Sequence, residues 1–217
     1  MKNKETTFII RNETVADYKA VETITRDAFW NLTVPGCNEH YLAHIMRDHP
    51  DFIPELDLIA ELDDRVIGNV MYTKARLVDE AGEELQILTF GPVSIHPEYQ
   101  RRGYSRLLLE HSFQKAAELG YDVIVIFGNP DNYVGRGFVS CKRHNICLEG
   151  GVFPAAMLVK ELQPDALDGR TWYYHESPVY NINNEKAEEF DKQFEPREKS
   201  WQPSQEEFYI HSHSLIQ

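Results

Sequence analysis

A cluster of residue types that bind phosphate groups lies at positions 100 to 105, in the order Gln-Arg-Arg-Gly-Tyr-Ser. A β-rich segment precedes it and a helical segment follows, so the cluster would form the first turn of a helix. That turn presents unpaired backbone N–H groups and the positive end of the helix dipole to an anion. Gly103 lets the backbone approach the anion closely, and Arg101 and Arg102 add positive charge. Ser105 can donate a hydrogen bond from its hydroxyl. The cluster predicts a pyrophosphate site, although a capped surface helix with solvated arginines would carry the same residue types.

Three segments around this cluster form one supersecondary unit. Residues Leu85 to Ile95 alternate as a strand, and the Gly-Pro pair inside it predicts a bulge or an unpaired stretch, because proline cannot donate to a ladder. A helical pattern follows from Tyr104 to Leu119. The apolar run Val123 to Phe127 is typical of a buried parallel strand. Together they predict a βαβ unit that places the cluster at a strand-to-helix turn.

The rest of the chain supplies further helices and strands. Thr14 with Asp17 resembles a capping box ahead of a helix in which Val15 shares the apolar face, and a second helix follows at about 38–49. The pattern then predicts a meander of strands from residue 58 to residue 78. Later elements are a short helix near 131–135, strands at 138–143 and 156–162, and helices at 184–194 and 205–215. A capping box formed by Ser204 and Glu207 is expected to open the last helix.

Composition limits the class of protein. The 217 residues carry a net charge of −13 and 42% hydrophobic residues, which suits one globular domain with a small addition. The acidic balance argues against a nucleic-acid partner and favours cationic ligands such as amines. No segment has the apolar length of a signal peptide or a membrane span. Three cysteines, with no Cys-x-x-Cys spacing, favour a reducing, cytoplasmic compartment.

Two motifs carry a resemblance to a known family. The stretch from Val93 to Leu109 resembles the acetyl-CoA motif of the GNAT superfamily of N-acetyltransferases, whose core is Q/R-x-x-G-x-G/A. Its three fixed positions fall on Gln100, Gly103 and Ser105, and serine stands where the family usually has glycine or alanine. Residues 133–138, Tyr-Val-Gly-Arg-Gly-Phe, look like the family's Y-x-x-x-G-F. By the order of its elements, the resemblance covers about residues 8 to 162.

The resemblance implies a fold and a domain organisation. The expected fold is α/β (α+β), with a mixed, mostly antiparallel sheet of six to seven strands, a central parallel βαβ unit and helices on both faces. Residues 1–162 would form the GNAT-like domain. Residues 163–217 hold 11 acidic and 5 basic residues and nine aromatic ones, and would form an extension folded onto the domain or onto a dimer partner.

The resemblance also implies a mechanism with acetyl-CoA as the acyl donor and no metal. An amine would attack the thioester directly, and a backbone N–H near Val93 would stabilise the developing oxyanion. Tyr133 would donate its proton to the leaving thiolate; a core aromatic is the alternative role for this residue. The expected cofactor-binding residues are Val93, Ser94, Ile95, Gln100, Arg101, Arg102, Gly103, Tyr104, Ser105, Asn129 and Asn132. The two asparagines are as well explained as turn formers.

Several points stay open in the sequence. The acceptor would be a primary amine of a small molecule or a peptide, including a protein amino terminus or lysine, and a homodimer is one option for assembly. The strand from Leu85 to Ile95 offers no carboxylate as general base, so a water relay is expected, with Glu61, His96 and Glu39 as candidates. A non-catalytic acyl-CoA sensor of the same fold is the alternative function.

Two further signals are set aside as sites of chemistry. His40 and His44 have the i, i+4 spacing of half a metal site, but no third ligand accompanies them. They are expected to line the acceptor entrance instead. Cys37 is expected to be a loop thiol near the acceptor, because direct transfer needs no acyl-enzyme.

Overall fold

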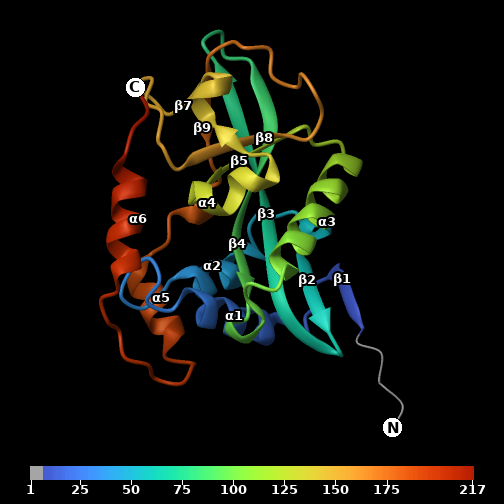
Figure 1. Ribbon diagram of the computed structural model, residues 1–217, viewed down its shortest axis with the longest axis vertical. Coiled ribbons are helices and arrows are strands. Elements are labelled where there is room, and N and C mark those ends of the chain that lie inside the picture. Colours follow the sequence, from blue (N-terminus) through green and yellow to red (C-terminus); the bar gives the residue numbers. More distant parts are fainter. Residues whose placement is uncertain (1–6) are drawn as a thin grey trace.

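One nine-stranded sheet organises the computed structural model, which describes residues 7–217 (Figure 1). The path of paired strands is β1-β2-β3-β4-β5-β8-β6, and β9 pairs with both β3 and β7. The β4–β5 and β7–β9 pairs are parallel, and the others are antiparallel. The strands are β1 (Phe8–Asn12), β2 (Leu58–Leu62), β3 (Arg65–Asp79), β4 (Glu84–Ile95), β5 (Val123–Phe127), β6 (Val139–Ser140), β7 (Ile146–Cys147), β8 (Met157–Glu161) and β9 (Trp172–His175). The predicted mixed, mostly antiparallel fold is confirmed.

Side chains along β3 point alternately to the two faces of the sheet, and helices cover both faces. Val70 and Tyr72 pack in the core beneath α3 (Tyr104–Glu118), where the Tyr72 hydroxyl lies 2.7 Å from that of Ser112. Met71 faces the other way and packs with α2 (Glu39–Met46). Helix α1 (Tyr18–Phe29) contacts β3, β4 and α2. The remaining helices are α4 (Pro130–Tyr133), α5 (Asn184–Asp191) and α6 (Pro203–His213).

The sheet opens at its centre. Strands β4 and β5 pair at Leu88 and Ile124, and no pair between them follows within the described residues. On its other side, β4 pairs with β3, but the register shifts where β4 contains Gly91 and Pro92. Proline lacks the N–H that a ladder needs, so the irregularity falls where the sequence predicts it. Because β4 and β5 pair only near Leu88, the backbone from Phe90 to Ile95 has no strand partner on the β5 side.

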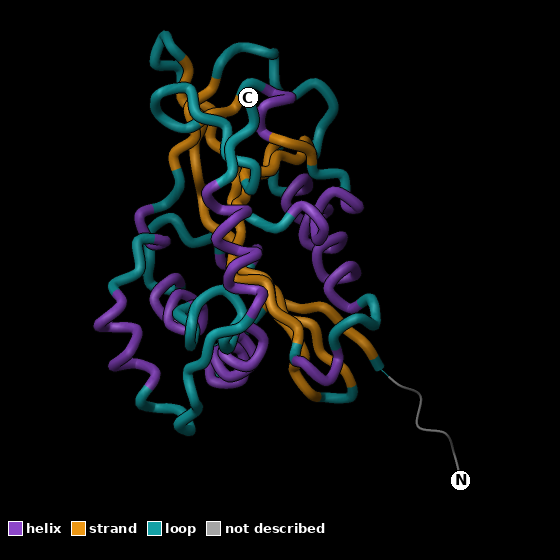
Figure 2. The backbone as a smooth tube through the Cα atoms, turned by 60° about the vertical axis from the view of Figure 1, so that its left-hand side comes forward, coloured by secondary structure: helices purple, strands orange, loops and turns teal. Residues whose placement is uncertain are grey.

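Helix α6 lies on the side of this opening away from α3, as Figures 1 and 2 show. It is tied down at both ends. Near its start, the Ser204 hydroxyl donates to the Leu32 carbonyl at 2.8 Å, in the loop after α1. Beyond its end, the Ala155 N–H donates to the Ser214 carbonyl at 2.8 Å, just before β8. The helix therefore bridges two parts of the fold that lie on opposite sides of the opening.

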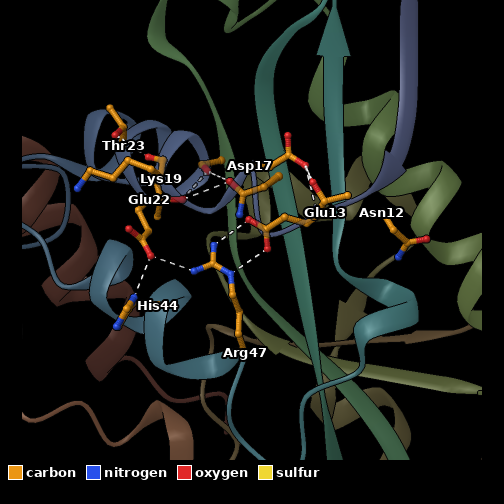
Figure 3. A network of polar contacts seen from close by, with 12 residues as sticks. Asn12, Glu13, Asp17, Lys19, Glu22, Thr23, His44 and Arg47 are labelled. Atoms are coloured by element: carbon orange, nitrogen blue, oxygen red, sulfur yellow. Dashed lines mark hydrogen bonds and ion pairs between the residues drawn. The ribbon is translucent and has the colours of Figure 1, made fainter.

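A buried ionic network fixes α1 and α2 against the segment after β1 (Figure 3). Arg47 makes two hydrogen bonds to Glu13, at 2.8 and 2.9 Å, and a third at 3.0 Å to Glu22. Glu22 is also 2.9 Å from His44 Nδ1. The side chains of Arg47, Glu13 and Glu22 are at most 8% exposed, so loss of one partner would leave a buried charge unpaired. The network holds two helices that form one wall of the opening.

Asp57 adds a pH-dependent contribution to the stability of this region. Burial, and then the neighbouring Glu13 carboxyl, raise the pKa of Asp57 well above its ordinary value of 3.8. The folded protein thus holds a proton that the unfolded chain releases near pH 4. The free energy of unfolding should therefore fall as pH rises from the ordinary pKa of an aspartate toward the raised pKa of Asp57, by up to about 1.4 kcal/mol per pH unit. Asp57→Asn is expected to flatten that decline in urea unfolding at about pH 6 and pH 9. The exposed Asp122→Asn is the control, and an unchanged slope in Asp57→Asn would refute the assignment.

Some predicted elements are wrong in detail. Helix α1 begins at Tyr18, so Val15 precedes it and is 77% exposed. Helix α6 begins at Pro203, which places Ser204 inside the first turn, where its hydroxyl binds Leu32 and does not cap. The predicted strand at 138–143 is reduced to β6, because a 3-10 turn interrupts it from Cys141. None of the helices between residues 7 and 217 is long and apolar enough to cross a membrane.

The strand count also differs, because β7 and β9 had not been predicted. Strand β3 is 15 residues long, and β2 pairs only with its first part. Strand β9 pairs with the last four residues of β3, from Arg76 to Asp79. It therefore covers an edge that would otherwise be exposed.

Candidate active site

A cleft of about 960 Å³ occupies the opening of the sheet. Strands β4 and β5 form its floor, the start of α3 and the turn around α4 form one side, and α6 with the loop after α1 forms the other. We call the first side the cofactor half and the second the acceptor half. The two halves differ in charge. Arg101, Arg106 and Arg136 line the cofactor half, and Glu39, Glu176 and Glu207 line the acceptor half.

The turn before α3 has the geometry of an anion site. Gln100 donates from Nε2 to the Ile95 carbonyl at 3.0 Å and so ties the turn to the end of β4. Arg101 and Gly103 adopt positive φ values of 60° and 89°, and α3 begins at the next residue, Tyr104. The first N–H groups of α3 then face the cleft, where a helix dipole favours negative charge. A Cβ on Gly103 would meet no atom within 4 Å, so it is the backbone angle that calls for glycine.

Tyr133 stands beside the opening between β4 and β5. Its ring packs against Phe90 and Phe138, with centroids 5.8 and 5.6 Å away, and the residue lines the cleft. Burial raises the pKa of Tyr133 to about 12, against a smaller opposing effect of Arg136. The phenol therefore stays protonated across the physiological pH range and is available as a proton donor.

The position of the Tyr133 ring depends on a glycine. A Cβ on Gly128 would lie 2.5 Å and 2.9 Å from two ring carbons of Tyr133. Gly128→Ala must therefore displace the ring, and overpacking of this kind costs about 1–3 kcal/mol. We expect Gly128→Ala to lower the rate of any reaction that uses the Tyr133 hydroxyl by about tenfold or more, because a small misplacement of a reacting group can cost up to about 10²-fold.

Gly135→Ala is the matched control for this change. Gly135 lies in the same segment, and a Cβ there would meet nothing within 4 Å. Steady-state rates and thermal unfolding of both variants check the prediction. Equal rates in Gly128→Ala and Gly135→Ala would show that the position of the ring does not matter.

A buried polar cluster supports β4 behind the cleft. Ser94 and Thr25 both donate to Asn69 Oδ1, the latter at 3.2 Å, and the two hydroxyls lie 3.1 Å apart. All three residues are at most 3% exposed. The cluster joins α1, β3 and β4, so it fixes the backbone of Val93 to Ile95 where that strand lines the cleft.

The carboxylates of the acceptor half differ in exposure: Glu39 is half-buried, and Glu176 and Glu207 are exposed. Glu39 accepts hydrogen bonds from the Thr33 hydroxyl at 3.3 Å and the Asn38 N–H at 3.0 Å, and burial raises its pKa. Burial also raises the pKa of Glu176. Tyr180 lies nearby, with its hydroxyl donating to the Gly91 carbonyl at 3.4 Å. The acceptor half thus reaches the irregular part of β4.

All but one of the predicted site residues line this cleft. They are Val93, Ser94, Ile95, Gln100, Arg101, Gly103, Tyr104, Ser105, Asn129, Asn132 and Tyr133. Arg102 lies outside the cleft lining, with its guanidinium 5.7 Å from the ring centroid of Tyr99. Of the candidate bases, Glu39 lines the cleft. Glu61 is paired with Arg11 at 2.7 Å, and His96 accepts from the Glu98 N–H at 3.3 Å.

The expectation that His40 and His44 line the acceptor entrance is wrong. His40 is fully buried, with Nδ1 3.4 Å from the Cys37 sulfur and Nε2 3.0 Å from Asp191. Burial lowers the pKa of His40 to about 4 and raises that of Cys37 to about 12, so both are neutral at pH 7. His44 pairs with Glu22. Within residues 7–217, no group of three or more His, Cys, Asp or Glu side chains is placed to hold a metal ion.

Glu176, Glu207, Phe208 and His211 line the cleft without having been predicted as site residues. They lie more than 70 positions after the cluster at residue 100, and no local motif marks them. Only the acidic and aromatic composition of residues 163–217 pointed to this part of the chain.

The parallel pair β4–β5 diverges beside the turn that opens α3, and this arrangement agrees with the family that the two sequence motifs indicate. Residues 24–141 match the family model described as "Acetyltransferase (GNAT) family". The chain belongs to this family, whose members are acyltransferases, and the family predicted from the sequence is confirmed.

Relatives in bacteria support the assignment. The uncharacterized N-acetyltransferase YhbS of Escherichia coli K12 is 30% identical over 172 residues, which cover 78% of this chain and 97% of YhbS. The crystal structure of E. coli YhbS in complex with CoA superposes with a TM-score of 0.71 at 26% identity, covering 84% of this chain and 96% of that one. A GNAT acetyltransferase from Brucella melitensis in complex with acetyl-CoA shares the fold, with a TM-score of 0.63 at 20% identity over 80% of this chain and 98% of its own.

Proposed function

We propose that this protein transfers an acetyl group from acetyl-CoA to a primary amine of a small molecule or peptide. The observation that carries the proposal is the continuity of the cleft, which joins a cradle for phosphate groups to a half lined by carboxylates. CoA carries a pyrophosphate at one end and a thioester at the other, and the cofactor half matches this order. The two structural relatives with CoA or acetyl-CoA bound support the same donor.

The residues of the cofactor half would hold and activate the donor. The N–H groups at the start of α3, with Arg101 and Ser105, would bind the pyrophosphate. Asn129 and Asn132 would contact the pantetheine or adenine side. The free backbone from Val93 to Ile95 would pair with the pantetheine arm, and an N–H near Val93 would stabilise negative charge on the thioester oxygen.

Proton transfers complete the reaction. Acetyl-CoA supplies an activated carbonyl, to which the amine nitrogen bonds as the carbon–sulfur bond breaks. Tyr133 would give its proton to the sulfur, so that CoA leaves as the thiol. Glu39 would accept the proton that the amine nitrogen loses, because it lines the cleft and burial raises the pKa of its carboxyl, which makes it a stronger base than a solvated glutamate. No acyl-enzyme is needed.

Glu39→Gln tests the proposed base. We expect kcat to fall by about 10²-fold for an alkylamine with a pKa near 10, since general-base catalysis typically contributes this much or more. An amine of low pKa, such as trifluoroethylamine, is already neutral at pH 7 and should lose much less. The pH profile should follow from the sign of the shift: the rate of the wild-type protein rises as Glu39 deprotonates, and the variant lacks this rise. Equal losses for both amines would exclude Glu39 as the base.

The function itself is tested by release of free thiol from acetyl-CoA in the presence of an amine panel. Thiol release that depends on an amine supports the transferase. An acyl-CoA sensor, the rival of a different class, would bind CoA and release no thiol. Peptide and small-amine panels would separate a small-molecule acceptor from a protein amino terminus or lysine.

The remaining proposals concern context. We place the protein in the cytoplasm, which three unpaired cysteines support, and leave a homodimer as a proposal. We treat residues 1–162 as the acetyltransferase domain and 163–217 as an extension that completes the acceptor half, since α6 lines the cleft.

A further inference from the structure

We infer that helix α6 is a gate over the acceptor half, with a hinge at its start and a latch at its end. The hinge is formed by Ser204 and Gln205 with the loop after α1, and the latch by residues 214–216 with residues 153–155. The latch opens to admit the acceptor and to release the acetylated product. This role goes beyond the proposed function and rests on it for the side from which the acceptor enters.

The middle of α6 is not anchored in the core. Gln205 is the one buried residue among its 11, and no other helix or strand within residues 7–217 packs along it. Phe208, Tyr209 and Ile210 are 48%, 57% and 55% exposed. A helix of this length is marginal in water without tertiary packing. The contacts at its two ends therefore hold α6 in place.

The start of α6 is the stronger attachment. The Ser204 hydroxyl donates to the Leu32 carbonyl at 2.8 Å. The buried Gln205 side chain donates to the carbonyls of Asn31 and Ser200, both at 3.0 Å. Asn31 also binds Ser200 from its own side chain, at 3.0 and 3.1 Å. These mutually supporting bonds keep the start of the helix fixed while the rest moves.

A pair of backbone hydrogen bonds holds the end of α6. The Ala155 N–H donates to the Ser214 carbonyl at 2.8 Å, and the Ile216 N–H donates to the Phe153 carbonyl at 2.9 Å. Leu215, between the two bonds, is 60% exposed. Hydrogen bonds of this kind each add little net stability, so the latch can open while the hinge stays closed.

The acceptor half lies beneath the middle of α6. The helix is tied on both sides of the opening, so a ligand reaches β4 from this side by passing under it (Figures 1 and 2). Glu207, Phe208 and His211 share one helical face and line the cleft. A ligand in this half would cover Phe208, and loss of exposed apolar surface favours the latched state. Acceptor binding would thus close the gate behind it.

The latch is attached to the segment that holds Tyr133. Ala156 directly follows the latch and lines the cleft, and its carbonyl accepts a hydrogen bond from the Gly128 N–H at 2.9 Å. Gly128 in turn lies against the ring of Tyr133. Closure of the gate and placement of the proposed proton donor are therefore linked through this segment.

Hydrogen exchange followed by mass spectrometry tests the latch. Ile216→Pro removes the N–H that binds Phe153, and Gln217→Pro is the control, since the Gln217 N–H makes no backbone hydrogen bond within the described chain. Amides of residues 207–213 should exchange about 3- to 10-fold faster in Ile216→Pro, the effect of one hydrogen bond, and at the wild-type rate in Gln217→Pro. Amides of α3 should be unchanged in both variants.

A reversible cross-link tests the gate. Pro154 and Leu215 form an antiparallel bridge, and cysteines at such a pair lie within disulfide range. Pro154→Cys with Leu215→Cys locks the latch when oxidised. The background is Cys141→Ala, because the Cys141 sulfur lies 3.6 Å from the Pro154 carbonyl.

The probe for the cross-linked protein is CoA whose sulfur is joined to hexylamine through a methylene and a carbonyl group. This conjugate fills both halves of the cleft without turnover. Its association rate should fall at least about tenfold on oxidation and recover on reduction, as expected if entry requires the open gate. The association rate of CoA alone should not change, because α6 does not line the cofactor half.

Two results would overturn the gate. One is equal exchange of the α6 amides in Ile216→Pro and Gln217→Pro. The other is equal association of the conjugate with the oxidised and the reduced protein. Neither measurement involves turnover, so both stand apart from thiol release, which alone decides the proposed acetyl transfer.

Discussion

Tyr133→Phe should lower kcat for acetyl transfer by about 10²- to 10⁴-fold, the usual contribution of a positioned proton donor. The variant removes one oxygen and leaves the ring, whose contacts with Phe90 and Phe138 hold that side of the cleft. Affinity for CoA and the KM for the amine should therefore change little. Steady-state thiol release and calorimetric titration of CoA measure the two effects separately.

Tyr121→Phe is the matched control for the loss of a phenolic hydroxyl. Tyr121 packs against the same hydrophobic core but lies outside the cleft lining. The control should keep wild-type rates. If Tyr133→Phe keeps the wild-type kcat, the Tyr133 ring has only a packing role. Water would then protonate the thiolate.

Gly103→Ala should weaken CoA binding by about 10- to 100-fold. Gly103 has a φ of 89°, which is unfavourable for alanine because of its Cβ. The substitution would therefore shift the first turn of α3 and the N–H groups that face the pyrophosphate. A hydrogen bond to a charged group contributes about 1.5–3 kcal/mol, which corresponds to this range of affinity. Titration of CoA monitored by calorimetry gives the number.

Gly120→Ala separates this effect from general loss of stability. Gly120 follows the other end of α3, has a φ of 86°, and would also place its Cβ in open space. Both variants should lose about 1–2 kcal/mol of unfolding free energy for the same conformational reason. Only Gly103→Ala should lose affinity. A similar loss of affinity in both would show that the cradle adds nothing beyond helix stability.

The cofactor half could be predicted from sequence because its information is local. A strand, a six-residue turn and a helix lie consecutively, so the types at Gln100, Gly103 and Ser105 report directly on the turn they build. Arg102 shows the limit of such reasoning, because two adjacent arginines look equivalent in sequence. The backbone turns Arg101 to the cleft and places Arg102 over Tyr99.

The acceptor half could not be predicted because long-range contacts build it. Strand β9 forms against a part of β3 almost a hundred residues earlier, and α6 docks on the loop after α1 about 170 residues earlier. The Ser204 and Glu207 pair has capping-box spacing, yet the Ser204 hydroxyl binds Leu32 and Glu207 lines the cleft. Tertiary packing, which the local pattern does not encode, decided both roles.

Helix α6 gives residues 163–217 a specific place in the proposed reaction. Its contacts with Leu32 and with residues 153–155 span the acceptor half, so changes in this segment would act on acceptor choice more than on CoA binding. The two halves of the cleft can thus be tested separately, with Gly103→Ala for the donor and Glu39→Gln for the acceptor.

The central claim is that the cleft joins acetyl-CoA to an amine and transfers the acetyl group. The most direct measurement follows free thiol and N-acetylated product together, by absorbance and mass spectrometry, with acetyl-CoA and a panel of primary amines as substrates. The proposed function predicts equal amounts of the two products, both abolished when the amine is omitted. Tight CoA binding with no thiol released across the full amine panel, or thiol released without N-acetylated product, would contradict it.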